Sequence, residues 1–382
     1  MARATWQGLV RFCLDEKLTS VLNTAVIDGF AALWLANDEE VSARIISIES
    51  KELLASAVSE AAELLASGEV VAVPTETVYG LAANALDSKA VSRIYQMKGR
   101  PSTNPLIVHL AGRDMIDSCV TRWDEDCDAL SRSFWPGPLT MVLPKSPVIP
   151  SNVTAGGDTV GIRWPSHPFM EALIRRCDFP LAAPSANLAN RLSPTTAFHV
   201  QTQLDDKLSL IVDGGACQFG IESTVVDMTG PRRRILRPGI IDLNALRASV
   251  ADIQANEGSD EGTLRGSETT LRSPGLQSKH YAPEANLRIE TWRDGEDLRD
   301  RIESMGFRSS DTHILAYNHI PAENSAQRIC LIPHDPEAYA RALYAELHQC
   351  DQLEAKLVLI EQIPKSSAWL GIADRLQRAA QS

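Results

Sequence analysis

The stretch VVAVPTET, residues 70–77, joins a short apolar run to a polar cluster that begins at a proline. The same arrangement recurs in LAAPSAN, residues 181–187. Between them, KGRPSTNPLIVH, residues 98–109, places two cations and an amide before a third apolar run. Ligands of α/β proteins are held at the ends of strands. These clusters therefore predict a site for a phosphate-bearing ligand beside a small polar one.

Apolar runs and helical periodicity alternate outward from these clusters, and we expect the following elements. Strands are predicted at 69–73, 106–110, 139–143, 159–163, 181–183, 209–212, 224–228 and 234–236. Helices are predicted at 51–66, 87–97, 124–133, 168–176, 195–204 and 242–250. Because strands and helices interleave irregularly, the pattern predicts an α/β fold built on a mixed sheet.

Changes in composition indicate the domain borders. Residues 1–45 have a weak pattern and are expected to be an appended segment, followed by a catalytic domain at 46–250. Residues 251–286 are expected to be a linker, because 251–272 is rich in Gly, Ser, Asp, Glu and Thr. A second, smaller α/β domain is predicted at 287–382, with strands at 287–290, 313–317, 328–332 and 356–360 and helices at 294–305, 335–349 and 367–380.

The whole chain has the properties of a reduced, cytoplasmic protein. Its 382 residues suggest two or three domains, and its net charge of −12 argues against general nucleic-acid binding. Seven dispersed cysteines without a CxxC pair do not indicate a disulfide framework. The histidines show no metal-ligand spacing, and no signal peptide or membrane-spanning stretch is evident.

Several polar side chains could carry chemistry, although each has an ordinary structural explanation. Lys98 and Arg100 flank Gly99 at a helix end, where both could turn toward one pocket or form a solvated pair. Arg163 ends an apolar strand and suits a carboxylate ligand or an ion pair. Ser185 and Asn187 follow another strand and could bind a ligand or simply form a turn. No GxxxxGK[ST] or GxGxxG loop occurs, so a nucleotide would be held without such a phosphate cradle.

Taken in order, these motifs closely resemble the threonylcarbamoyl-AMP synthases, the YrdC-like family. The matching stretches are PTETVYGLAANALD (74–87), KGRPSTNPLIVHL (98–110), FWPGPLT (134–140), TAGGDTVGIRWPSHP (154–168), APSANLANRLSPTTAFHV (183–200), DGG (213–215), ESTVVD (222–227) and LRPG (236–239). The resemblance implies an open, twisted α/β sheet with a cationic cavity. SPGLQSKHYAP (273–283) and the final GIADRLQRAA resemble the long form of the enzyme, which has a small Rossmann-like C-terminal domain. The HYAP segment (280–283) of the linker is expected to close over bound ATP like a lid.

The resemblance also implies a reaction and its partners. The enzyme makes threonylcarbamoyl-AMP from L-threonine, bicarbonate and ATP with Mg²⁺ and releases pyrophosphate. A transferase complex then moves the threonylcarbamoyl group to the adenosine beside the anticodon of tRNA. In this mechanism the threonine amine captures CO₂, the carbamate attacks the α-phosphorus, and cations neutralise the phosphates.

Site residues follow from the same resemblance. The catalytic set falls on Lys98, Arg100, Ser185 and Asn187. The ATP contacts fall on Arg100, Asn104, Thr159, Ser185, Ser193, Arg237 and Tyr281. The threonine contacts fall on Thr77, His109, Arg163, Ala183 and Ser223. No protein side chain is assigned to a metal.

Two departures and two alternatives accompany this prediction. In the second domain, Trp369-Leu370-Gly371-Ile372 replaces a more glycine-rich turn. Ala189-Asn190 stands where many members have Ser-Gly, which puts the geometry of that loop in question. The same fold could instead serve as an RNA-binding module, although the net charge of −12 and the lack of an aromatic platform disfavour it. A carbamoyl-transfer domain of the hydrogenase-maturation type is the other alternative, but the zinc-finger and acylphosphatase-like segments that it predicts are missing from the sequence.

Overall fold

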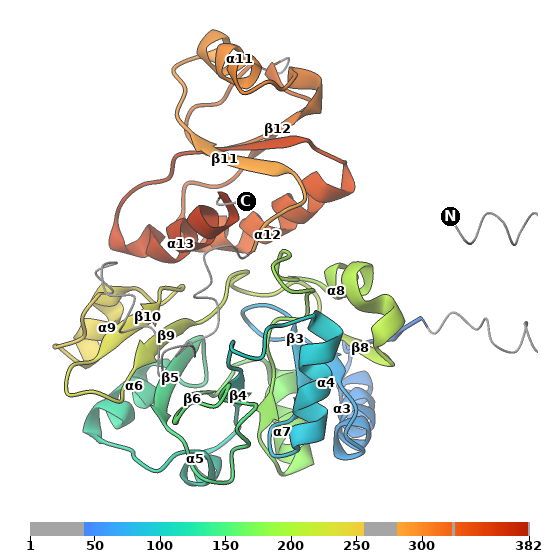
Figure 1. The fold of residues 1–382 in the computed structure, drawn as a ribbon, viewed down its shortest axis with the longest axis vertical. Helices are drawn as coiled ribbons and strands as arrows, with labels where there is room; N and C mark the ends of the chain where they lie inside the picture. The colour runs from blue at the N-terminus through green and yellow to red at the C-terminus, as the bar shows by residue number, and fades with distance from the viewer. Residues whose placement is uncertain (1–41, 256–280, 323–324, 381–382) are drawn as a thin grey trace, which may run out of the picture. The chain divides into compact units, whose positions relative to one another are not determined.

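The computed structural model describes residues 42–255, 281–322 and 325–380, which contain two sheets with helices around them (Figure 1). All of these elements belong to the unit Ala43–Ser382. Most of the predicted N-terminal segment lies outside the described residues, and so do residues 256–280 of the linker predicted at 251–286, including His280.

The larger sheet belongs to the first domain, predicted at 46–250, and its first strand begins at Arg44, two residues before that predicted border. In the described residues it has ten strands in the order β1-β8-β2-β3-β7-β4-β6-β5-β9-β10. The strands are β1 (Arg44–Ser47), β2 (Val71–Val73), β3 (Gly80–Asn84), β4 (Ile107–His109), β5 (Leu139–Pro144), β6 (Thr159–Arg163), β7 (Leu181–Ala182), β8 (Leu210–Asp213), β9 (Thr224–Asp227) and β10 (Arg234–Arg237). Pairing is parallel for β4 with β6 but antiparallel for β4 with β7, so the predicted mixed sheet is confirmed.

Helices cover both faces of this sheet, since its central strands are buried on both sides. Val71 and Val73 of β2 pack into one apolar cluster, whereas Ala72 between them packs into another. The first cluster includes residues of α3 and α7, and the second includes residues of α4, α6 and α8. The helices are α3 (Lys51–Ala66), α4 (Ser88–Lys98), α5 (Arg113–Cys119), α6 (Glu125–Phe134), α7 (Pro168–Cys177), α8 (Ala197–Leu204) and α9 (Leu243–Ser249).

The smaller sheet carries the C-terminal domain, which we take as residues 286–380. Its four described strands are all parallel, in the order β11-β14-β12-β13. Its elements are β11 (Asn286–Glu290), α11 (Gly295–Ser304), β12 (Thr312–Ala316), β13 (Arg328–Leu331), α12 (Pro336–Gln352), β14 (Leu357–Glu361) and α13 (Leu370–Ala380). Asp335 caps α12 by accepting a hydrogen bond from the backbone of Ala338, with proline in the first turn. The predicted second α/β domain is thus present.

Candidate active site

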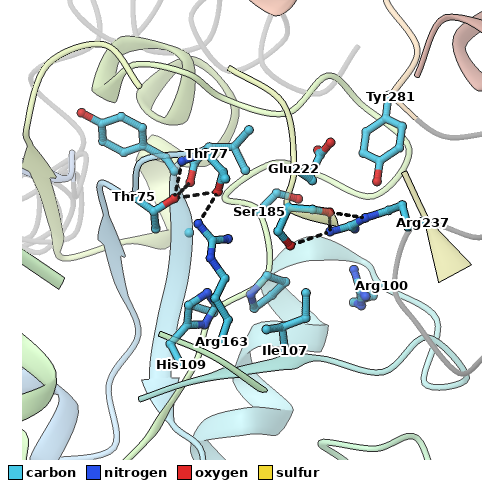
Figure 2. A pocket seen from close by; sticks show the side chains of 16 residues that line it. Thr75, Thr77, Arg100, Ile107, His109, Arg163, Ser185, Glu222, Arg237 and Tyr281 are labelled. Atoms are coloured by element: carbon cyan, nitrogen blue, oxygen red, sulfur yellow. Dashed lines mark hydrogen bonds between the residues drawn. The ribbon is translucent and has the colours of Figure 1, made fainter. Parts of the chain in front are cut away.

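A single cavity gathers most of the predicted site residues (Figure 2). The space between its lining residues amounts to about 530 Å³, a figure that includes open solvent at its mouth. The predicted residues that line it are Thr77, Arg100, His109, Arg163, Ala183, Ser185, Ser223, Arg237 and Tyr281. Segments that are far apart in the sequence therefore meet at one place.

The parallel strands β4 and β6 supply the floor of the cavity. His109 pairs in register with Arg163, and both residues end their strands. Ile107 lies two residues before His109, so both side chains share one face of β4 and line the cavity. Burial, and then the nearby Arg163, lower the pKa of His109 to about 3, so its imidazole is neutral at physiological pH.

The segment after β2 supplies hydroxyl groups and a carboxylate. Arg163 Nη2 donates a hydrogen bond to Thr77 Oγ1 at 3.0 Å and lies 2.6 Å from Glu76 Oε1. Thr75 Oγ1 donates to the carbonyl oxygen of Val78 at 2.6 Å and lies 3.0 Å from Thr77 Oγ1. The predicted ion pair of Arg163 is therefore present. The same guanidinium lines the cavity, and its binding of a carboxylate ligand stays a prediction.

The start of β9 and the end of β10 form another wall. Arg237 ends β10, and its Nε and Nη2 donate to the carbonyl oxygen of Ser223 at 3.2 and 3.1 Å. Nη2 also donates to Ser223 Oγ at 3.2 Å, and Ser223 Oγ lies 2.8 Å from Thr140 Oγ1. These contacts fix a buried cation at the cavity. Burial lowers its pKa, and the guanidinium remains charged at neutral pH.

Lys98 and Arg100, the two cations at the end of α4, take different positions relative to the cavity. Gly99 follows the helix with φ of 60°, a left-handed conformation that favours glycine, and the chain reverses there. Arg100 then lines the cavity, where Asn104 Oδ1 accepts from its Nη2 at 2.7 Å. Burial lowers the pKa of Arg100 to about 10, so this guanidinium also keeps its charge at neutral pH.

Lys98 lies behind the cavity wall, outside the set of residues that line it. Its ammonium donates to the carbonyl oxygens of Ser185 and Asn187, the latter at 2.5 Å, and to Asn187 Oδ1 at 3.1 Å. Burial, and then Arg100, lower the pKa of Lys98 well below its usual range. Lys98 and Asn187 therefore hold the loop that presents Ser185 to the cavity.

Three further predicted residues do not line the cavity. Thr159 begins β6, at the other end of that strand from Arg163. Ser193 is buried, and its hydroxyl donates to Glu222 Oε1 at 2.5 Å. Asn104 does not line the cavity itself, but its Oδ1 accepts a hydrogen bond from Arg100, which does.

The backbone of Asn190, at the position where many family members have glycine, is left-handed. Its φ is 67°, so asparagine keeps here a conformation that glycine would also permit.

The sequence did not single out Glu222 as a site residue, yet it lines the cavity. Burial alone would raise its pKa, but Arg375 and then Arg237 outweigh that effect and lower the pKa to about 2. An acidic residue two positions before the buried strand β9 was the available signal. Its partner, Arg375, lies 153 residues further along the chain.

The guanidinium and hydroxyl groups that line the site suit anionic ligands. Among residues 42–255, 281–322 and 325–380, no three His, Cys, Asp or Glu side chains gather as metal ligands would. The carboxylates of Glu76 and Glu222 each contact an arginine.

In the described part of the chain, no helix is both long and apolar enough to cross a bilayer.

Comparisons with known proteins identify the class to which this fold and site belong. Residues 63–239 match the Sua5–YciO–YrdC family model, described as telomere recombination. Residues 241–381 match the family model described as threonylcarbamoyl-AMP synthase, C-terminal domain. The two matches follow one another along the chain, as the sequence predicted for a two-domain form.

Individual relatives extend over both domains. A threonylcarbamoyl-AMP synthase of Pyrococcus abyssi is 36% identical over 323 residues, covering 84% of this chain and 93% of the relative. One of Bacillus subtilis is 38% identical, covering 85% and 92%. The crystal structure of P. abyssi Sua5 complexed with L-threonine superposes with a TM-score of 0.78 at 34% identity, covering 88% and 97%.

The chain belongs to the threonylcarbamoyl-AMP synthase family. The predicted fold class and the predicted activity, that of a nucleotidyltransferase-type enzyme in tRNA modification, are confirmed. The assignments of individual site residues stay predictions.

Proposed function

We propose that this cavity joins L-threonine, bicarbonate and ATP into threonylcarbamoyl-AMP, with release of pyrophosphate. One observation carries the proposal: the guanidinium groups of Arg100, Arg163 and Arg237 line one cavity together with the hydroxyls of Thr77 and Ser185. Fixed buried cations suit a triphosphate and a carboxylate, because charge-assisted hydrogen bonds to such groups are strong.

Threonine is assigned to the end of the cavity at Arg163. Its carboxylate would bind this guanidinium, with Thr77 and Ser223 offering hydroxyls and Ala183 its backbone. His109 stays neutral beside Arg163, so it can contact threonine without adding charge. The crystal structure of P. abyssi Sua5 with L-threonine supports an amino-acid subsite in a related chain.

ATP is assigned to the end at Arg100 and Arg237. Both cations would bind phosphates, with Ser185 and Tyr281 as further contacts from the wall. Asn104 would act by holding Arg100, and Ser193 by holding Glu222. Thr159 keeps its ATP assignment from family resemblance alone.

The reaction needs positioned reactants and stabilised negative charge. Bicarbonate takes up a proton and loses water to give CO₂. The threonine amine then adds to CO₂ and releases a proton, which gives a carbamate, so the net products of these two steps are the carbamate and water. A carbamate oxygen then attacks the α-phosphorus, and the bond from that phosphorus to the bridging oxygen of pyrophosphate breaks. Arg100 stabilises the charge that develops on the phosphates, while Lys98 and Asn187 keep Ser185 in place. Mg²⁺ enters with ATP as part of the substrate.

The product passes to a second enzyme in this proposal. Threonylcarbamoyl-AMP is a mixed anhydride, so a transferase complex would consume it to modify tRNA. A cytoplasmic location fits this task, and it fits the free thiols of Cys119 and Cys127.

Pyrophosphate release tests the proposal. Purified protein with ATP, Mg²⁺, bicarbonate and threonine should release pyrophosphate, and omission of threonine should abolish that release. Replacement of threonine by alanine tests whether the amino-acid subsite is selective. Release that continues at the same rate without any amino acid would contradict the proposal.

A further inference from the structure

The C-terminal domain contributes to the wall of the active site through one buried side chain. Arg375 of α13 is 1% exposed, and its Nε donates to Glu222 Oε2 at 2.7 Å. Its Nη1 donates to the carbonyl oxygen of Pro238 at 2.9 Å, and its guanidinium carbon lies 5.3 Å from the ring centre of Tyr281. Glu222 and Tyr281 line the cavity, and Pro238 directly follows Arg237. Arg375 therefore contacts three segments of the wall at once.

We propose that Arg375 is a positioning residue of the active site, which fixes Glu222 in the wall and neutralises its carboxylate so that the cavity stays cationic toward ATP. The inference rests on the proposed function, because it assigns a task within the same site. It also gives the C-terminal domain a part in catalysis that the sequence alone did not indicate.

Charge explains why Glu222 needs this partner. The carboxylate is ionised and faces the space where Arg100 and Arg237 are assigned to the phosphates of ATP. Without Arg375, this buried carboxylate would repel the triphosphate or pair with Arg237. Either outcome would weaken ATP binding, because electrostatic interactions are strong in a buried site.

Two further hydrogen bonds to the Glu222 carboxylate support the same assignment. Ser193 donates to Oε1 at 2.5 Å, and Tyr344 of α12 donates to Oε2 at 3.3 Å. Two helices of the C-terminal domain thus reach one carboxylate of the first domain. Ser193, which the sequence assigned to ATP, is held by that carboxylate, so a shift of Glu222 would also displace Ser193.

The alternative is that Arg375 only holds the two domains together. Arg341 of α12 offers a control, because its Nε donates to the carbonyl oxygen of Gln218 at 2.7 Å and so joins the domains through a backbone group four residues before Glu222. Removing one partner of a buried ion pair destabilises a protein, whereas replacing both partners with neutral groups often does not. The double variant R375M/E222Q therefore separates charge from folding.

The experiment measures KM for ATP, KM for threonine and kcat for wild type, R375M, R375M/E222Q and R341M, with ATP binding followed by calorimetry. R375M should raise KM and Kd for ATP by about tenfold or more and leave KM for threonine within about twofold. R375M/E222Q should return both ATP values to within about threefold of wild type. R341M should behave as wild type.

Three results would overturn the inference: an unchanged affinity for ATP in R375M, an equal loss in R341M, or a double variant that binds ATP as poorly as R375M. If R375M does not fold, the double variant decides, since tenfold weaker ATP binding by the folded double variant contradicts a role through charge. If wild type releases no pyrophosphate, the proposed function fails, while calorimetry of ATP still tests Arg375.

Discussion

At the scale of the residue, Arg100 is the one of the two predicted cations at the end of α4 that lines the cavity, where it is proposed to bind the phosphates of ATP. R100A should lower kcat/KM by about 100-fold or more, as removal of one electrostatic group in a closed site often does. R93A is the control, since Arg93 lies in α4, the helix that precedes Arg100, and pairs at an exposed site with Glu69, 2.5 Å away. Steady-state pyrophosphate release measures both variants. Equal rates in R100A and R93A would contradict the assignment.

Arg163 leads to a prediction about the other substrate. R163M should raise KM for threonine by about tenfold or more, because it removes the partner proposed for the carboxylate. It also leaves Glu76 as a buried carboxylate without its ion pair, which costs stability.

R163M/E76Q separates these two effects. The double variant should regain thermal stability, but it should keep the high KM for threonine, because the guanidinium is still missing. Recovery of the KM as well would show that Arg163 serves the fold and not the substrate.

At the scale of the element, α13 packs against the turn after β10. A Cβ on Gly371 would lie 2.6 Å from the carbonyl oxygen of Gly239, which is backbone and cannot move aside cheaply. G371A should therefore destabilise the protein by about 1–3 kcal/mol, although alanine is the better helix former. G230A is the control, since its nearest neighbour would be 3.7 Å away. Denaturant unfolding compares the two variants, and a G371A chain as stable as G230A would contradict this account of the contact.

The elements differ in how well the sequence predicts them. Apolar periodicity predicts α3, and the structure has it at Lys51–Ala66, where Ser50 is its N-cap. Sequence reasoning missed β3, because GLAAN consists of residues that rarely favour strands, and its position is decided by antiparallel pairing with β2. It also missed β1, which lies at the edge of the sheet beside β8, and the short, polar helix α5. Tertiary contacts decide these three elements.

The residues of the site also differ in how well the sequence predicts their positions. Motifs identified Arg100, Arg163 and Arg237, because each stands at the end of a strand or helix that the pattern predicts. They could not show that Lys98 turns away from the cavity toward Ser185 and Asn187, since that depends on the path of a distant loop. The contact of Arg375 with Glu222 could not be predicted from the sequence either, because the two residues belong to different domains.

At the scale of the whole molecule, two histidines link the domains. His199 of α8 and His348 of α12 stack with ring centres 3.8 Å apart. Burial lowers the pKa of His348 to about 4, and burial together with His348 lowers the pKa of His199 to about 3. Both values lie below the unfolded value of about 6.5, so the stability that the neutral rings contribute is present above about pH 6.5 and is lost as the pH falls toward 4.

H348Q should therefore lose less stability than wild type between pH 7 and pH 5, by about 1–2 kcal/mol. Unfolding by urea at pH 7, 6 and 5 measures this difference. H334Q, which changes an exposed histidine of the same domain, should follow wild type. An H348Q chain with the pH dependence of wild type would show that the stacked pair does not control stability in acid.

The identity of the nucleotide product tests the central claim most directly. Wild-type protein is incubated with ATP, Mg²⁺, threonine and ¹³C-bicarbonate, and the nucleotides are analysed by mass spectrometry. The account predicts threonylcarbamoyl-AMP that carries the labelled carbon, formed together with pyrophosphate and strongly reduced in R100A. A nucleotide product without threonine or without the label would contradict it.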